Sequence, residues 1–275
     1  MVIFLVFLLY FSDTGVVIVD NVWFYGDDHK IRVLETGDLV EIIELHEDTV
    51  KIKYDNAVGV ILKGVLIDFK ENIAEDELFV FARGYFDDGK YWNAVSLFDA
   101  FIRFFDESEY YAEALYYHGL SYEALARHLN SPDSIPGVLF NEHYNICYYS
   151  GESYMTILED YAESMYASKA AYCLFNIFRT SNQPWRDSIQ LIQEELKMWQ
   201  DFAVKYKNTG EYVLALLEIG YLNRVLFEIT EDSDYRTDAV KVFQEILDKY
   251  PNSVNSAQSK VNLHEIENRK KIYKY

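Results

Sequence analysis

The feature that most constrains the fold is a frame of four residue types that recurs in the C-terminal two thirds of the chain. An aromatic residue is followed seven positions later by a second, then by Ser or Thr, then by a small residue. The copies are Phe98-Phe105-Ser108-Ala114, Tyr154-Tyr161-Ser164-Ala170, Trp199-Tyr206-Thr209-Ala215 and Phe243-Tyr250-Ser253-Ser259. Aromatics two turns apart share a helix face, and Ser or Thr can cap the next helix. A unit that cannot bury its own face must stack on the next one, so the frame predicts an array of helical hairpins.

Helical periodicity begins at Glu75 and continues to about residue 270. Leu78, Phe81, Ala82 and Tyr85 follow the i, i+3, i+4, i+7 pattern of an amphipathic helix. Successive Ser/Thr positions of the frame are 56, 45 and 44 residues apart. Residues 75–270 are therefore predicted to be an all-α domain of about four hairpins, with loop insertions near 130–150 and 180–190.

Residues 16–70 have a different period. Short β-branched runs alternate with turn residues, and Val50 to Tyr54 alternates with period two, as a half-buried strand does. Asp55-Asn56 then favours a tight hairpin. Four or five such strands predict a small closed barrel.

This region resembles a bacterial SH3 domain. The resemblance rests on the turn and strand Glu35–Ile43, on the strand Thr49–Tyr54, and on Val58–Ile61. In the last segment Val60 stands where the family has Trp, which is often part of a ligand-facing aromatic surface. The resemblance implies binding of peptide or peptidoglycan.

The helical region resembles tetratricopeptide (TPR) repeats. Tyr91 to Phe98 follows the Tyr-x-x-Ala-x-x-x-Phe pattern, and the Tyr-Pro-x-Ser link Tyr250–Ser253 looks most like the BamD/YbgF class of periplasmic TPR proteins. The fold class expected from both resemblances is α+β and multidomain: a small SH3-like β-barrel followed by an all-α TPR-like superhelical array.

The chain opens with ten apolar residues, Val2 to Phe11. This run fits the core of a secretory signal and is too short to span a bilayer, which needs about 20 residues. Residues 1–15 are therefore predicted to be a signal peptide or short anchor, and the mature chain to be periplasmic or extracytoplasmic, in the cell envelope. A buried first strand is the alternative.

The formal charge is −20, and residues 71–168 alone contribute −14. Such a surface repels nucleic acid and anionic lipid, so we expect no nucleic-acid partner and membrane contact only through the N-terminal segment. The acidic residues form either a solvated face or a docking surface for a basic partner. Cys147 and Cys173 are compatible with one disulfide or with two buried thiols.

Catalytic and metal-binding patterns are weak. No GxGxxG, HExxH or GxSxG motif occurs, and His143 with Cys147 would supply only two metal ligands, and then only on a helix. We expect no cofactor, no metal and no enzyme activity.

The sequence thus predicts a protein–protein interaction scaffold of the cell envelope, whose TPR-like groove binds a protein or peptide. The alternative is a cell-wall-associated protein whose SH3-like domain binds peptidoglycan while the array recruits an enzyme. The candidate partner-binding residues are aromatic, because aromatic side chains dominate binding hot spots. They are Trp23, Tyr25, Tyr110, Tyr117 and Tyr149.

Overall fold

A computed structural model describes residues 14–26, 29–70, 74–129, 135–182 and 188–270. The predicted signal or anchor segment lies almost entirely outside these residues. The chain divides into two compact units, residues 1–138 and 139–275. The first unit holds a β-sheet and three helices, and the second holds a β-hairpin and six helices, counted over the described residues. The α+β class predicted from the sequence is confirmed at this level.

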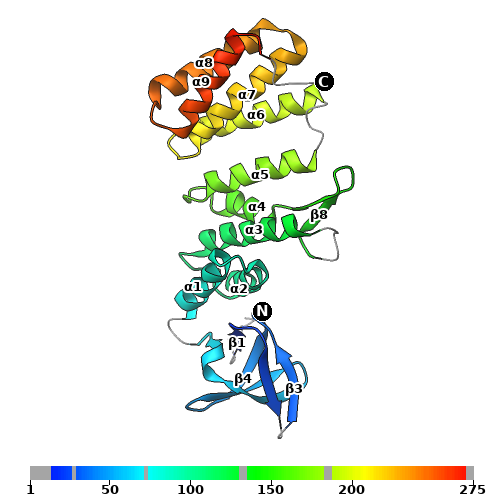
Figure 1. The fold of residues 1–275 in the computed structure, drawn as a ribbon. Helices are drawn as coiled ribbons and strands as arrows, with labels where there is room; N and C mark the ends of the chain where they lie inside the picture. Colours follow the sequence, from blue (N-terminus) through cyan, green and yellow to red (C-terminus); the bar gives the residue numbers. More distant parts are fainter. Residues whose placement is uncertain (1–13, 27–28, 71–73, 130–134, 183–187, 271–275) are drawn as a thin grey trace, which may run out of the picture. The chain divides into compact units, whose positions relative to one another are not determined.

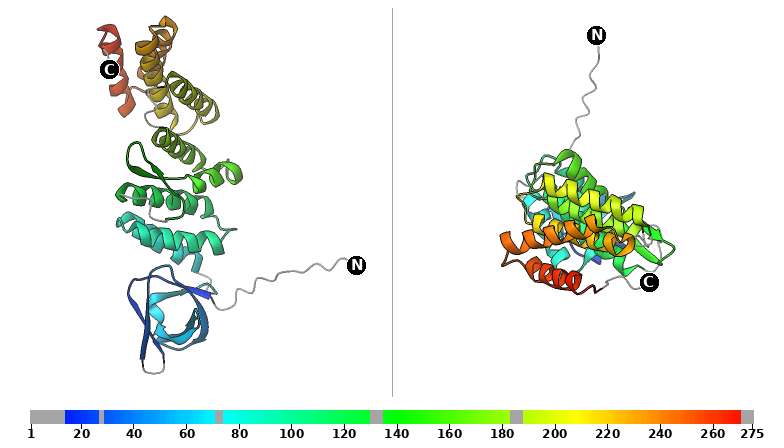
Figure 2. Two further views of the ribbon diagram at one scale, coloured as in Figure 1. Left: turned by 90° about the vertical axis from the view of Figure 1, so that its right-hand side faces the viewer. Right: turned by 90° about the horizontal axis from the view of Figure 1, so that it is seen from above.

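The first unit begins with a curled, antiparallel seven-stranded sheet in the order β3-β2-β6-β5-β4-β1-β7 (Figure 1; Figure 2, left). A 3₁₀ turn, Lys63–Val65, precedes the last strand. The strands are β1 Thr14–Val17, β2 Val22–Gly26, β3 His29–Leu34, β4 Leu39–Leu45, β5 Thr49–Tyr54, β6 Ala57–Leu62 and β7 Leu66–Asp68. Val50 and Ile52 of β5 are buried and Tyr54 is partly buried, as the alternation predicts, and Val50 and Ile52 pack with Phe24 and Ile61 inside the curl.

Three helices complete the first unit: α1 Ala74–Asp87, α2 Tyr91–Phe104 and α3 Tyr111–His128. They share a core with the sheet, since Val16 and Ile67 of the strands pack with Leu78 and Phe98 of the helices. This core includes residues on both sides of 70–75, between the predicted barrel at 16–70 and the predicted helical domain at 75–270. The sheet and α1–α3 therefore form one body.

Two close contacts fix the joint between the sheet and the helices. The hydroxyl of Tyr85 in α1 donates to the carbonyl of Ile18 at 2.7 Å. Gly37 has a φ of +92°, and a Cβ placed there would lie 2.3 Å from the Cβ of Ser96 in α2. Only glycine combines this backbone conformation with this approach.

The second unit opens with the strands β8 Val138–Asn141 and β9 Ile146–Tyr149, where the sequence predicts a loop insertion. His143 and Cys147 therefore lie in a hairpin and not on a helix. The helices that follow are α4 Glu152–Asp160, α5 Ala167–Ser181, α6 Ile189–Lys205, α7 Tyr212–Thr230, α8 Ser233–Lys249 and α9 Val254–Glu267. Cys147 and Cys173 are both buried.

The four-residue frame has the same structural meaning in each copy. The first aromatic is fully buried in a helix in all four copies, as Phe98, Tyr154, Trp199 and Phe243. The second aromatic is the residue that ends that helix, as Phe105, Tyr161, Tyr206 and Tyr250. The small residue of the next helix, Ala114, Ala170, Ala215 or Ser259, is also fully buried. The pairs α2–α3, α4–α5, α6–α7 and α8–α9 are thus the repeated hairpins.

The Ser/Thr position makes a recurring turn. In each copy its N–H donates to the carbonyl of the second aromatic, as Ser108 to Phe105 and Ser253 to Tyr250. The predicted helix cap, by contrast, forms at Ser253, whose hydroxyl accepts from the N–H of Ser256. Helices α3, α5 and α7 have no side-chain cap hydrogen bond. The frame therefore encodes a turn more generally than it encodes a cap.

No helix in the described part of the chain is long and apolar enough to cross a membrane.

Candidate functional site

The structure separates the five predicted partner-binding residues. Tyr149, on β9, is only 2% exposed. Its hydroxyl lies 2.8 Å from the Ser153 Oγ and accepts from the Ser153 N–H. Tyr149 is therefore part of the core of the second unit and offers no surface to a partner in this conformation.

Tyr110 and Tyr117 are half-buried in the first unit. The ring of Tyr110 stacks on Phe79 with centroids 4.9 Å apart, and the Arg83 guanidinium lies 3.6 Å from the centre of the Tyr117 ring. The charges of Asp76 and Glu109 raise the pKa of Tyr110, while burial raises that of Tyr117. Both tyrosines therefore pack within the first unit and remain partly exposed.

Trp23 and Tyr25 are different, because both point outward from β2. They are 42% and 51% exposed, whereas the alternating residues Val22 and Phe24 are buried in the sheet core. The strand therefore exposes Trp23 and Tyr25 to solvent and buries Val22 and Phe24 in the sheet core.

The neighbouring strand β6 adds apolar side chains to the same outer face. Val58 and Leu62 are 43% and 63% exposed and Val60 is half-buried, while the intervening Gly59 and Ile61 are buried. The outward side chains Trp23, Tyr25, Val58, Val60 and Leu62 are called the β2–β6 face below. Sequence analysis missed Val58 and Leu62, although their alternation with Gly59 and Ile61 was available as a signal.

Gly59 explains how the two strands come together. A Cβ at this position would lie 2.3 Å from the carbonyl oxygen of Tyr25, so only glycine allows β2 to pass this closely. The pairing then sets Tyr25 directly opposite Val60. An aromatic ring of the adjacent strand therefore lies beside Val60.

Lysines border the β2–β6 face on the side of β5. Lys51 pairs with Val60 and Lys53 with Val58 across the sheet. Lys53 donates to the Glu41 carboxylate of β4 at 2.8 Å. The face therefore has an apolar, aromatic centre and a charged rim, as binding surfaces commonly have.

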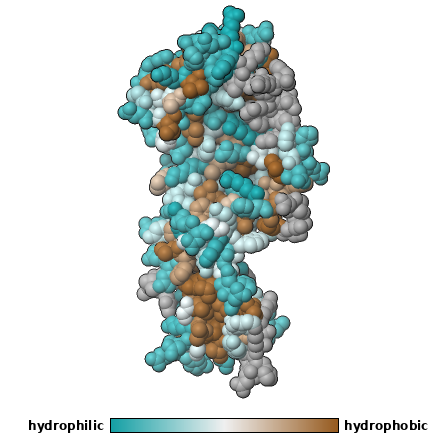
Figure 3. Space-filling model, viewed as in Figure 1, coloured by the Kyte–Doolittle hydropathy of each residue, from teal (hydrophilic) through white to brown (hydrophobic). Residues whose placement is uncertain are grey.

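Hydrophobic side chains also gather over the sheet in the space-filling view of Figure 3. Ile43 and Leu45 of β4 are nearly half exposed as well. Single exposed apolar residues are ordinary, but several on adjacent strands indicate an interaction surface.

No protein-family model matches this sequence, and neither does any curated protein. Function must therefore be argued from the residues themselves.

Proposed function

We propose that the chain is a non-catalytic interaction scaffold of the cell envelope. In this proposal its sheet is an SH3-like barrel, its helices are a TPR-like array, and the chain binds a protein or peptide partner. The observation that carries the proposal is the β2–β6 face, in which Trp23, Tyr25 and Leu62 are exposed together although neighbouring apolar residues of the same strands are buried. Exposed aromatic side chains with a polar rim are typical of binding hot spots.

The helical part has a supporting role in this proposal. The half-buried Tyr110 and Tyr117 make a lesser contribution than the sheet face, since their rings are already engaged with Phe79 and Arg83. The shared core of Val16, Leu78 and Phe98 packs the sheet against α1–α3.

Site-specific photo-crosslinking tests the proposal in cells. A photoreactive phenylalanine replaces Leu62 in the full chain, and the control replaces Val204 of α6, which is 83% exposed. We expect one defined crosslinked protein from position 62 and none from position 204. The crosslink should disappear in the Trp23→Ala, Tyr25→Ala double variant. Equal labelling from both positions would contradict the proposal.

Peptidoglycan is the alternative ligand, favoured by the exposed rings of Trp23 and Tyr25, since aromatic rings pack well against sugar faces. Co-sedimentation of the full chain with purified cell wall tests it. Retention that is lost in the same double variant would favour the cell-wall function. Because Val16 and Leu78 share one core, deletion of the helices from residue 75 would expose that core, so point variants are the better probe.

A further inference from the structure

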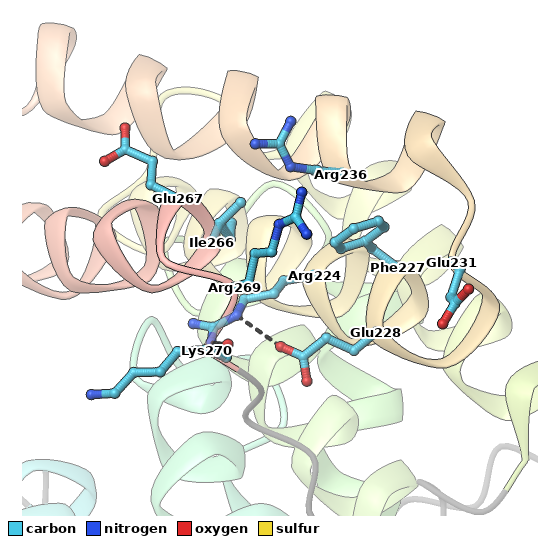
Figure 4. A pocket seen from close by; sticks show the side chains of 9 residues that line it. All are labelled: Arg224, Phe227, Glu228, Glu231, Arg236, Ile266, Glu267, Arg269 and Lys270. Atoms are coloured by element: carbon cyan, nitrogen blue, oxygen red, sulfur yellow. Dashed lines mark hydrogen bonds and ion pairs between the residues drawn. The ribbon is translucent and has the colours of Figure 1, made fainter.

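A cavity of about 760 Å³ opens among the last three helices of the second unit (Figure 4). Its walls come from α7, with Arg224, Phe227 and Glu228, from Arg236 of α8, and from the end of α9, with Arg269 and Lys270. Its volume lies within the range of about 300–1,000 Å³ that ligand sites occupy.

Arg224 builds the floor and is only 1% exposed. Its guanidinium donates to Glu228 Oε1 at 3.1 Å, to Glu265 Oε2 at 2.9 Å and to Asn262 Oδ1 at 2.8 Å. It also donates to the Lys270 carbonyl at 2.9 Å, which ties the end of α9 to α7. The charge of Arg224 is therefore used within the structure, and this residue positions the cavity wall.

Arg236 and Arg269 are in the opposite situation. Within the described residues, neither guanidinium makes a hydrogen bond or an ion pair. In Figure 4 the two groups come near each other beside the Phe227 ring, whereas the carboxylates of Glu231 and Glu267 point away from them. Two like charges without an acid between them form a natural binding place for an anion.

The backbone conformation at Arg269 is an unfavourable one for an arginine. Arg269 has a φ of +51°, its N–H donates to the Ile266 carbonyl, and the Lys270 N–H donates to the Glu265 carbonyl. This is the helix-ending motif whose left-handed position is usually Gly. An arginine in this conformation is less stable than glycine would be, as is Glu231 at the end of α7 with a φ of +60°.

The charges around the cavity are unevenly paired. Arg224 is neutralised by Glu228 and Glu265, which leaves Arg236 and Arg269 as the guanidiniums of the lining that are available to a ligand. A carboxylate offers one oxygen to each of these two guanidiniums. Phe227 and Ile266 supply an apolar wall beside the two free guanidiniums.

We propose that this cavity binds the carboxylate of an Asp or Glu side chain in a peptide segment, with an adjacent apolar residue on Phe227. Arg236 and Arg269 hold the carboxylate oxygens. The proposal rests on the interaction function only in taking a peptide as the source of the carboxylate. It concerns a different unit from the β2–β6 face, so crosslinking at Leu62 can fail without affecting it, and the reverse also holds.

Nuclear magnetic resonance of the arginine Nε–H groups in the full chain tests the proposal. The probes are two dipeptides blocked at both ends, acetyl-Phe-Glu-amide and acetyl-Phe-Gln-amide. We expect the Glu probe to shift the Arg236 and Arg269 signals and to bind roughly tenfold more tightly than the Gln probe, because a charged acceptor strengthens each hydrogen bond. No shift up to about 20 mM Glu probe, or equal binding of both probes, would overturn the proposal.

Arg269→Gly is the decisive variant, since glycine suits the backbone at this position and the fold is kept. We expect it to weaken binding of the Glu probe about tenfold. The matched control is Lys241→Gln on the exposed face of α8, which removes the same charge away from the cavity and should leave affinity within about twofold. Equal losses of affinity in both variants would show that general electrostatic attraction causes the effect, and would overturn the proposal. Displacement of the Glu probe by inorganic phosphate more readily than by acetate would overturn the assignment to a carboxylate.

Discussion

The two units bury polar groups in different ways. In the first unit, the joint between the sheet and the helices is mostly apolar, with Val16 and Ile67 against Leu78. The Tyr85 hydroxyl donates across it to the Ile18 carbonyl, and the Asn93 amide donates to the Asp20 carboxylate at its exposed edge. In the second unit, the fully buried Arg224 of α7 donates to Asn262 and Glu265 of α9 and to the Lys270 carbonyl just after it, and also to Glu228 of its own helix.

The two units therefore depend on different kinds of interaction. An apolar joint depends on shape, so it should be sensitive to an added atom and insensitive to charge. A complete buried ion cluster contributes little net free energy to stability. Removal of one partner, however, destabilises the fold strongly. The same contrast holds for the two surface sites, since the β2–β6 face is aromatic and apolar and the second-unit cavity is charged.

The largest loss of stability is expected from Arg224→Met. Removal of the guanidinium leaves Glu228, whose side chain is 6% exposed, without its cation and takes one of two cations from the partly exposed Glu265, at a cost of roughly 3 kcal/mol. Urea unfolding followed by circular dichroism measures it. The comparison variant Lys197→Met breaks an exposed pair with Asp201 and should cost less than about 0.5 kcal/mol. Similar losses in both variants would show that the Arg224 cluster is not the polar centre of its unit.

Gly37→Ala should cause the next largest loss of stability. The left-handed backbone and the collision with Ser96 together cost roughly 2–4 kcal/mol in the free energy of unfolding. Gly64→Ala is the control, because a Cβ at Gly64 meets nothing within 4 Å. If both variants unfold at the same urea concentration, the sheet does not depend on a close approach to α2.

Arg269→Gly should change stability in the opposite direction. Relief of the left-handed conformation is expected to raise the free energy of unfolding by about 1 kcal/mol, measured in the same urea experiment. Glu231→Gly, at a residue with a φ of +60°, provides a comparison and should give a similar gain. A loss of stability in Arg269→Gly would mean that the arginine is structural and would weaken the case for an anion site.

The smallest effect concerns pH and the buried Glu195 of α6. Burial raises the pKa of Glu195 above its usual value of 4.5, and this outweighs the ion pair with Arg179. A carboxyl whose pKa is higher in the folded state stabilises the fold most below its unfolded pKa. That contribution is lost as pH rises through the folded pKa, by about 1.4 kcal/mol per unit of pKa difference.

The expected outcome is a decline of stability above about pH 4.5 that is reduced in Glu195→Gln. Urea unfolding at several pH values measures it. Gln preserves an acceptor for Arg179 and for the Trp199 indole N–H, both of which now donate to Glu195 Oε1. Glu194→Gln on the exposed face of the same helix is the control. Parallel pH profiles for wild type and Glu195→Gln would contradict the expectation.

The repeated frame was predictable because each position depends on its neighbours in sequence. Trp199 is buried and Tyr206 ends its helix for reasons of helical period alone. Outward Trp23 and Tyr25 follow from strand alternation, whereas Tyr149, named as a candidate on the same aromatic criterion, lies in a core. Nothing local distinguishes a surface tyrosine from one whose hydroxyl bonds to Ser153 in a core.

The sequence by itself determined the two periods of this chain, the positions of its turns and the residues that its hairpins bury, because these depend on contacts a few residues apart. Only the tertiary structure decided that the sheet shares a core with α1–α3, that Tyr25 stands beside Val60, and that Arg236 and Arg269 meet at one cavity. Each of these brings together residues far apart in the sequence, such as Val16 with Leu78, Tyr25 with Val60 and Arg236 with Arg269. Their encounter depends on how whole elements pack, which no local pattern encodes.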